Sequence, residues 1–265
     1  MPAAPFFREA GSGPGVVCVH PNASSSGQWR GLMDLLAPKF HVLAADSYGA
    51  GKSPAFTGSS GPSLSDEAAL LEPVFAKAGE PFSLVGHSYG GAVALIAALA
   101  NPKRVRALAL YEPTLFALVE REKPSPNDVD GIRHAADAAI AACEAGDRVA
   151  ASRAFIDFWM GGPMFDRMPE RNREAIVASI EGVRAWKAAL FGEPTPLAAF
   201  AALRMPVLLL VGSRSPLSSR AVAQRLARAL PDVERVEMEG LGHMGPVTHP
   251  EPVNQRIRRF LEKYS

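Results

Sequence analysis

Short runs of β-branched residues and leucine alternate along the chain with longer segments in which apolar residues recur at helical spacing. Because strands joined by helices pair in parallel, this alternation predicts an α/β fold with a mostly parallel central sheet and helices on both faces. The strands are predicted at residues 16–20, 41–45, 82–85, 105–111, 207–211 and 233–238, and the helices at 28–37, 65–78, 88–100, 219–230 and 253–264.

The alternation stops between residues 113 and 200, where no segment has a convincing strand pattern. Helical patterns at 131–145 and 148–159 are separated there by several prolines, which end helices because they lack a backbone N–H. We therefore predict a core of residues 1–112 and 201–265, with an inserted helical cap of residues 113–200. The length of 265 residues is near the upper size for one domain, which fits a single core that carries an insertion.

The most informative motif lies at residues 85–91, which read Val-Gly-His-Ser-Tyr-Gly-Gly between a predicted strand and a predicted helix. Gly86 and Gly90 lack a Cβ, so the strand can reverse into the helix while Ser88 takes a strained backbone conformation. The helix is expected to start at Ser88, with its positive dipole end toward the oxygen that turns negative in acyl transfer. This context favours a nucleophile elbow with Ser88 as the attacking residue. A glycine-rich turn without chemistry is the alternative.

Four segments together resemble the α/β-hydrolase fold over nearly the whole chain. They are Arg-Glu-Ala-Gly-Ser-Gly at 8–13 with the strand that ends at His20, the turn at 46–53, the elbow, and Gly-Leu-Gly-His at 240–243. Their order along the chain is the order typical of this family. The resemblance implies hydrolysis through a covalent intermediate, with no cofactor and no metal ion.

A base must accompany Ser88, because a serine hydroxyl is a poor nucleophile until an imidazole takes its proton. His243 lies after the last predicted strand and before the final helix, where the resemblance also implies the catalytic histidine. We therefore predict His243 as the base, the alternative being a histidine of a surface loop. His249 stands next to Pro250 and further from the strand end, so we interpret it as structural.

The acid of the triad departs from the usual pattern. Family members commonly have an aspartate after the strand at 207–211, but residues 212–216 here read Gly-Ser-Arg-Ser-Pro. Glu112 follows the strand at 105–111, and some branches, including one group of haloalkane dehalogenases, are similar in having a glutamate there. The order Ser88, Glu112, His243 also matches the expected succession. Alternatives are Ser215 as a hydrogen-bonding support, Glu239 as the acid, or a merely structural Glu112.

The oxyanion hole requires two backbone N–H groups near Ser88. Tyr89, the residue after the nucleophile, is expected to supply one. The loop after the first predicted strand should supply the other, but it contains Pro21, which has no N–H. Asn22 matches the usual donor position, and Ala23 is the alternative.

The predicted cap contains large apolar side chains that are expected to sit above Ser88. Most should pack the cap against the core, and a minority should line an apolar substrate pocket. The predicted pocket residues are Phe158, Trp159, Met160 and Trp186. Three cationic side chains of the cap are suited to a substrate carboxylate, although solvated helix faces explain them equally well: Arg153, Arg184 and Lys187.

The function predicted from these features is a serine hydrolase that cleaves a small, rather apolar ester, thioester or lactone through an acyl-enzyme. The same residues serve carbon–carbon bond hydrolases and perhydrolases of similar fold, so those reactions stay open. A serine at the elbow argues against dehalogenation, which in the family relies on an aspartate there. A ligand-binding or receptor-like protein that keeps the fold is the second alternative, because fold does not fix function.

Composition narrows the possible partners. The 28 basic and 27 acidic residues nearly cancel, which gives no electrostatic case for nucleic acid or an anionic membrane, so the expected partner is a small-molecule substrate. Cys18 and Cys143 lie in apolar settings and predict neither a disulfide framework nor a zinc site. With no leader pattern and no long apolar span, we expect a cytoplasmic protein. No pattern indicates an oligomeric state.

One turn of the chain is similar to part of a phosphate-binding loop. Residues 49–53 read Gly-Ala-Gly-Lys-Ser and resemble the end of such a loop. The full pattern requires glycine at the position of Asp46, and Pro54 stands where the phosphate-facing helix would continue. Nucleotide hydrolysis is therefore rejected.

Overall fold

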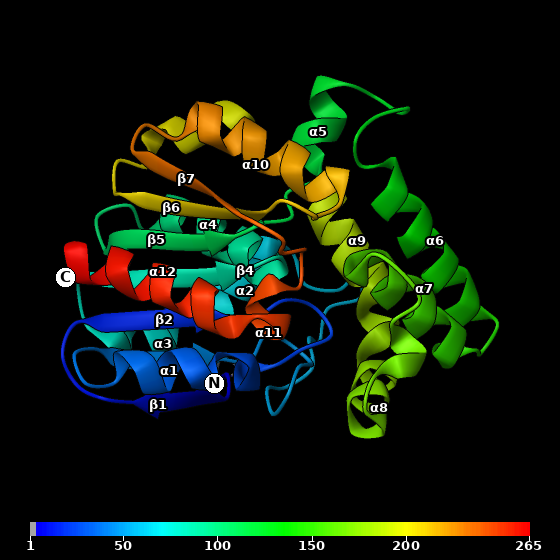
Figure 1. The fold of residues 1–265 in the computed structure, drawn as a ribbon, viewed down its shortest axis with the longest axis horizontal. Coiled ribbons are helices and arrows are strands. Elements are labelled where there is room, and N and C mark those ends of the chain that lie inside the picture. Colours follow the sequence, from blue (N-terminus) through cyan, green and yellow to red (C-terminus); the bar gives the residue numbers. More distant parts are fainter. Residues whose placement is uncertain (1–3) are drawn as a thin grey trace.

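The computed structural model describes residues 4–265; residues 1–3, which belong to the N-terminal segment in which we expected no leader, lie outside this range. Its centre is a seven-stranded sheet with the strand order β1-β3-β2-β4-β5-β6-β7 (Figure 1). β1 is antiparallel to β3 and every other pair is parallel. The strands are β1 Phe7–Ala10, β2 Gly15–Val19, β3 His41–Ala45, β4 Phe82–His87, β5 Val105–Tyr111, β6 Val207–Gly212 and β7 Val233–Met238. The predicted fold class is confirmed.

The sequence pattern missed β1. This strand has only four residues, including the charged Arg8 and Glu9, so it lacks the apolar run by which the other strands are recognised. Its backbone is ordered by antiparallel pairing with β3, which is a tertiary contact. β1 is therefore specified by its pairing with β3 and not by a pattern in its own sequence.

Helices cover both faces of the sheet. On one face, α1 (Arg30–Leu36) and α12 (Pro250–Lys263) pack on strand residues such as Val16 and Leu208. On the other, four helices pack on alternate residues of the same strands, including Val17 and Leu209. They are α2 Leu64–Leu70, α3 Glu72–Ala78, α4 Tyr89–Ala100 and α10 Leu217–Ala229. Because both faces are buried, the central strands are apolar at nearly every position.

One predicted helix is divided into two helices in the structure. The segment at 65–78 divides at Leu71 into α2 and α3, and Pro73 stands in the first turn of α3. A proline in a continuous helix would remove one backbone hydrogen bond and clash with the preceding turn, whereas the first turn tolerates it. Ser63 and Asp66 form a capping box that fixes where α2 begins.

The chain between β5 and β6 is helical, with no strand among these described residues. Its α-helices are α5 Ala117–Glu122, α6 Asp130–Glu144, α7 Arg148–Met160, α8 Glu170–Ser179 and α9 Val183–Gly192. Figure 1 shows α6 to α9 gathered beside one end of the sheet. We propose that residues 113–200 form the cap, inserted between core segments 1–112 and 201–265, and we call them the cap segment.

A substitution at Gly90 tests how tightly the elbow is packed. A Cβ at this position would overlap the backbone carbonyl of Val19, so Gly90→Ala should force β2 and α4 apart. We expect it to lower the free energy of unfolding by at least about 3 kcal/mol, measured by urea denaturation. Gly192→Ala is the matched control, because nothing lies within 4 Å of a Cβ there. Equal stability of the two variants would contradict close packing at the elbow.

Candidate active site

Ser88 lies between the end of β4 and the start of α4, with φ 55° and ψ −118°. The helix therefore begins at Tyr89 and not, as the sequence predicted, at Ser88. Such backbone angles cost energy for any residue with a Cβ, and neighbouring contacts must hold them. The Ser88 N–H donates to the carbonyl of Tyr111 on β5 at 2.9 Å. The elbow is thus fixed by the adjacent strand.

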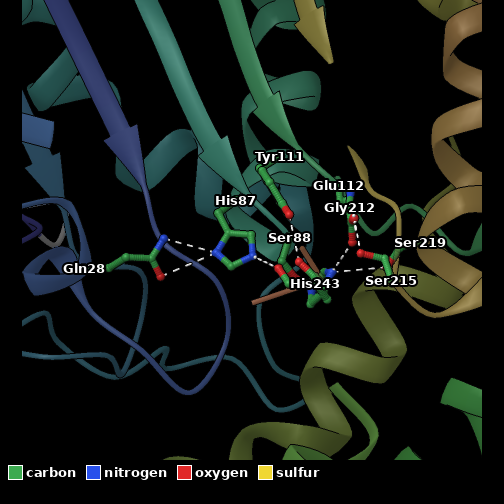
Figure 2. A network of polar contacts seen from close by, with 10 residues as sticks. Gln28, His87, Ser88, Tyr111, Glu112, Gly212, Ser215, Ser219 and His243 are labelled. Carbon is green, nitrogen blue, oxygen red and sulfur yellow. Dashed lines mark hydrogen bonds and ion pairs between the residues drawn. The ribbon is translucent and has the colours of Figure 1, made fainter. Parts of the chain in front are cut away.

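Ser88, His243 and Glu112 form a continuous line of contacts (Figure 2). His243 Nε2 is 2.9 Å from Ser88 Oγ, and His243 Nδ1 is 2.6 Å from Glu112 Oε2. All three residues are buried. A carboxylate accepts only, so the Nδ1 proton of the imidazole points to Glu112 and Nε2 is free to accept the serine proton.

Strand order explains why these residues meet. β4 and β5 are neighbours in the sheet, so the residues that follow them, Ser88 and Glu112, lie side by side. His243 comes from the loop between β7 and the short helix α11 (Gly245–Thr248). In a parallel sheet the carboxyl ends of all strands share one edge, where functional side chains gather.

The second oxygen of Glu112 is held by the turn after β6. The Gly212 N–H donates to Glu112 Oε1 at 2.6 Å, and the Ser215 hydroxyl donates to the same oxygen. Ser215 thus contacts Glu112, and the described residues give it no hydrogen bond to His243. Glu112 itself has φ 46°, a strained angle that turns its side chain back over β6. The usual pattern has the acid in the turn after β6. Here that turn binds the carboxylate of Glu112 instead.

Sequence reasoning missed Ser219, whose Oγ lies 3.2 Å from His243 Nδ1. Ser219 lies in the first turn of α10, and Ser215 precedes that helix. The contact depends on how α10 packs beside the loop of His243, so the sequence offered no local signal for it.

A second histidine, also missed, holds the loop of His243. His87 Nε2 donates to the carbonyl of His243 at 2.9 Å, and His87 Nδ1 accepts from Gln28 Nε2 at 3.1 Å. The hydroxyl of Tyr111 donates to the neighbouring carbonyl of Gly242 at 2.8 Å. Burial lowers the pKa of His87 well below its ordinary value, with His243 nearby adding to the effect. His87 is therefore a neutral support.

The loop after β2 supplies the other side of the site. His20 donates from Nδ1 to the carbonyl of Pro21 at 2.7 Å and accepts from the Ser47 N–H at 3.0 Å. In a trans peptide the carbonyl and the following N–H point in opposite directions, so the Asn22 N–H points away from His20. Asn22 and Ala23 both line the cavity beside Ser88, and Ala23 has φ 52°.

A cavity of about 250 Å³ opens beside Ser88 and His243, between the core and the cap segment. Of the predicted pocket residues, Trp159, Met160 and Trp186 line it. Phe158 does not line it. Successive helix residues are turned by about 100°, so Phe158 faces α6, where its ring lies 3.2 Å from the place of a Cβ on Gly131.

Trp159 of α7 brings the cap segment into contact with His243 of the candidate triad. Its indole is stacked on the imidazole of His243, with ring centroids 4.0 Å apart and planes at 27°. Phe116, Phe155 and Phe158 surround the indole. The indole therefore covers one face of the imidazole of His243.

The three cationic candidates of the cap segment have different surroundings. Arg153 pairs with Asp166 and Arg184 pairs with Glu144, and neither arginine lines the cavity. Lys187 lines it and pairs with Asp137.

The remaining candidates lie apart from Ser88. Glu239 is exposed in a separate groove next to β7. His249 is the residue at the N-cap position of α12, and its ring is hydrogen-bonded to the Thr248 hydroxyl. In the turn that resembles a phosphate-binding loop, the Asp46 carboxylate accepts hydrogen bonds from the N–H groups of Ser26 and Lys52. A carboxylate thus occupies the centre of this turn.

Within 4–265, no helix has the length and apolarity needed to cross a membrane. No cluster of histidine, cysteine, aspartate and glutamate in this range is arranged to bind a metal ion.

Comparison with known proteins decides the family. The model of the Alpha/beta hydrolase family matches residues 16–256. The chain belongs to the alpha/beta hydrolase family. This hydrolase is 26% identical to a pimeloyl-[acyl-carrier protein] methyl ester esterase of Yersinia pseudotuberculosis, over 94% of this chain and 93% of the relative. It is 27% identical to a 2-(acetamidomethylene)succinate hydrolase of Mesorhizobium japonicum, over 96% and 90%.

Solved structures agree on the fold. The enol-lactonase of Burkholderia xenovorans LB400 superposes on this hydrolase with a TM-score of 0.79 and 18% identity, over 97% of this chain and 96% of that chain. At that identity the likeness concerns the fold alone.

Glu67 of α2 is a buried carboxyl group next to the elbow, and the sequence did not point to it. It accepts hydrogen bonds from the Tyr89 hydroxyl at 3.3 Å and from the Tyr48 N–H at 3.1 Å. Burial raises its pKa from 4.5 to about 7, aided by the nearby charge of Asp66 and opposed by these two hydrogen bonds.

This raised pKa predicts a stability that depends on pH. Between pH 4.5 and about 7 Glu67 binds more protons in the folded state than in the unfolded state, so the contribution of Glu67 to stability falls as pH rises through that window. The loss should be about 3 kcal/mol, and Glu67→Gln should abolish it. Urea denaturation at several pH values measures this slope, with Glu239→Gln as an exposed control. The same slope in the wild-type protein and in Glu67→Gln would contradict the assignment.

Proposed function

We propose that this hydrolase cleaves a small, rather apolar ester, thioester or lactone through an acyl-enzyme formed on Ser88. The observation that carries the proposal is the line of contacts from Ser88 Oγ to His243 and from His243 to Glu112, at 2.9 and 2.6 Å. The printed names of the relatives, an esterase and a hydrolase of a succinate derivative, support the same class of reaction.

In the first half of the reaction, Ser88 Oγ attacks the carbonyl carbon while His243 Nε2 takes the hydroxyl proton. Glu112 accepts the Nδ1 hydrogen bond and stabilises the imidazolium that forms. The tetrahedral intermediate then collapses, and His243 returns the proton to the leaving oxygen or sulfur. The acyl group remains bonded to Ser88.

In the second half, a water molecule gives its proton to His243 and attacks the acyl carbon. The second tetrahedral intermediate releases the acid and restores the Ser88 hydroxyl. The N–H groups of Tyr89 and Asn22 stabilise the oxyanion in both halves. Tyr89 is suited to this because the first N–H groups of a helix have no partner within the helix.

Trp159 contributes to the same steps. Its ring covers one face of the imidazole, which excludes water there and restricts the orientation of the imidazole beside Ser88. The cap segment thereby acts on the chemistry as well as on binding. Its aromatic and aliphatic side chains supply the apolar wall against which an acyl group packs.

A fluorophosphonate probe tests the nucleophile without knowledge of the substrate. We expect stoichiometric labelling, mapped by peptide mass spectrometry to the peptide that contains Ser88. Ser88→Ala should abolish labelling and lower kcat for p-nitrophenyl butyrate by at least about 10³-fold. Tight binding of esters without any acyl-enzyme would favour a ligand-binding protein instead.

Glu112→Gln tests the acid. Glutamine keeps the shape of the side chain but can present an N–H to His243, so we expect kcat to fall by about 10³- to 10⁴-fold. Ser215→Ala should cost less than about tenfold, because the Gly212 N–H still holds the carboxylate. Glu239→Gln should leave kcat unchanged. If Ser215→Ala proved the more damaging of the two, the supporting role would move to Ser215.

A further inference from the structure

The wall of the cavity has one cationic side chain among the described residues, that of Lys187 on α9. Asn172 on α8 is a polar residue of the same wall, and the other side chains that α7, α8 and α9 contribute to it are apolar. Ser88 is buried at the inner end, whereas the Lys187 side chain is 25% exposed and Asn172 is exposed. The cavity is therefore apolar along its length and cationic toward solvent.

The ion pair of Lys187 leaves it available to a ligand. Its partner Asp137 is 51% exposed, and pairs of this kind contribute little to stability because water competes for both groups. An ammonium group has three donors, and Asp137 takes one. A partly solvated site also keeps the cost of dehydrating an anion low.

The alternative for Lys187 is a purely structural role, in which its ion pair connects two helices of the cap segment. Another cation on the same helix serves as the comparison. Arg184, less than one turn away on α9, pairs with Glu144 of α6, just as Lys187 pairs with Asp137 of α6. Both pairs connect the same two helices. Only Lys187 lines the cavity, so only Lys187 can contact a substrate there.

We propose that Lys187, with the side-chain amide of Asn172, binds a terminal carboxylate of the acyl chain. The preferred substrates are then monoesters of dicarboxylic acids. The ester lies at Ser88, the methylene groups lie along the apolar wall, and the carboxylate lies at the cavity mouth. One ammonium and one amide match the two oxygens of a carboxylate, whereas phosphate sites commonly use arginine or several backbone N–H groups. This proposal rests on the ester hydrolysis proposed above.

The test compares substrates in matched pairs. Monomethyl adipate, pimelate and suberate are each measured against the methyl ester of the monocarboxylic acid of the same chain length. The readout is the ratio of kcat/KM values, which cancels effects common to both substrates. The wild-type protein should prefer at least one of the charged substrates by about tenfold or more, mainly through KM.

Four variants separate binding from bracing. Lys187→Met should lower the preference for the charged substrate by about tenfold, and Lys187→Glu should reverse it. Asp137→Asn should increase the preference, because the competing carboxylate is gone. Arg184→Met removes the same charge from the same helix and should leave the ratio unchanged.

The outcomes that would overturn the proposal are distinct from failure of the proposed function. Equal ratios for Lys187→Met and Arg184→Met, or a wild-type preference for the uncharged esters, would remove the carboxylate site while leaving Ser88-dependent hydrolysis intact. Hydrolysis of the uncharged esters that persisted in Ser88→Ala would instead remove the proposed function.

Discussion

The arrangement of this site depends on backbone strain at three positions. Among residues 4–265, the non-glycine residues with positive φ are Ala23, Ser88 and Glu112, and all three face the same end of the sheet. Each angle costs of order 1–3 kcal/mol and persists only where its surroundings enforce it. Here they do: the Ser88 N–H is bonded to β5, and the Glu112 side chain is bonded to the turn after β6. The packed sheet stabilises a geometry that the isolated segments would not keep.

The position of Glu112 shows how a carboxylate that follows a neighbouring strand can reach the same imidazole. β5 and β6 are paired in parallel, so the turns that follow them are adjacent. A carboxylate from either turn can therefore approach the same imidazole. In this hydrolase the turn after β6 provides the Gly212 N–H and the Ser215 hydroxyl, which hold one oxygen of Glu112 while the other faces His243.

The cap segment contacts the candidate triad and also lines the cavity beside it. Trp159 of α7 is stacked on His243, while Lys187 of α9 stands in the wall of the same cavity. A shift of α7 would thus alter both the cover over the imidazole and the shape of the cavity. This coupling explains why aromatic residues are concentrated in a segment that adds nothing to the sheet.

The sequence by itself determined the elements that carry their own signal. Apolar runs specified six strands, and the Gly-His-Ser-Tyr-Gly turn specified the elbow, because strand burial and steric freedom are local properties of those residues. It also singled out Glu112 and His243, which lie within hydrogen-bond distance of each other, although their catalytic roles remain proposals. Tertiary structure alone decided β1, the supports His87 and Ser219, the orientation of Phe158 away from the cavity, and the choice of Lys187 over Arg184. Each of these depends on which segment lies opposite a side chain, and that is set by packing between residues far apart in the chain.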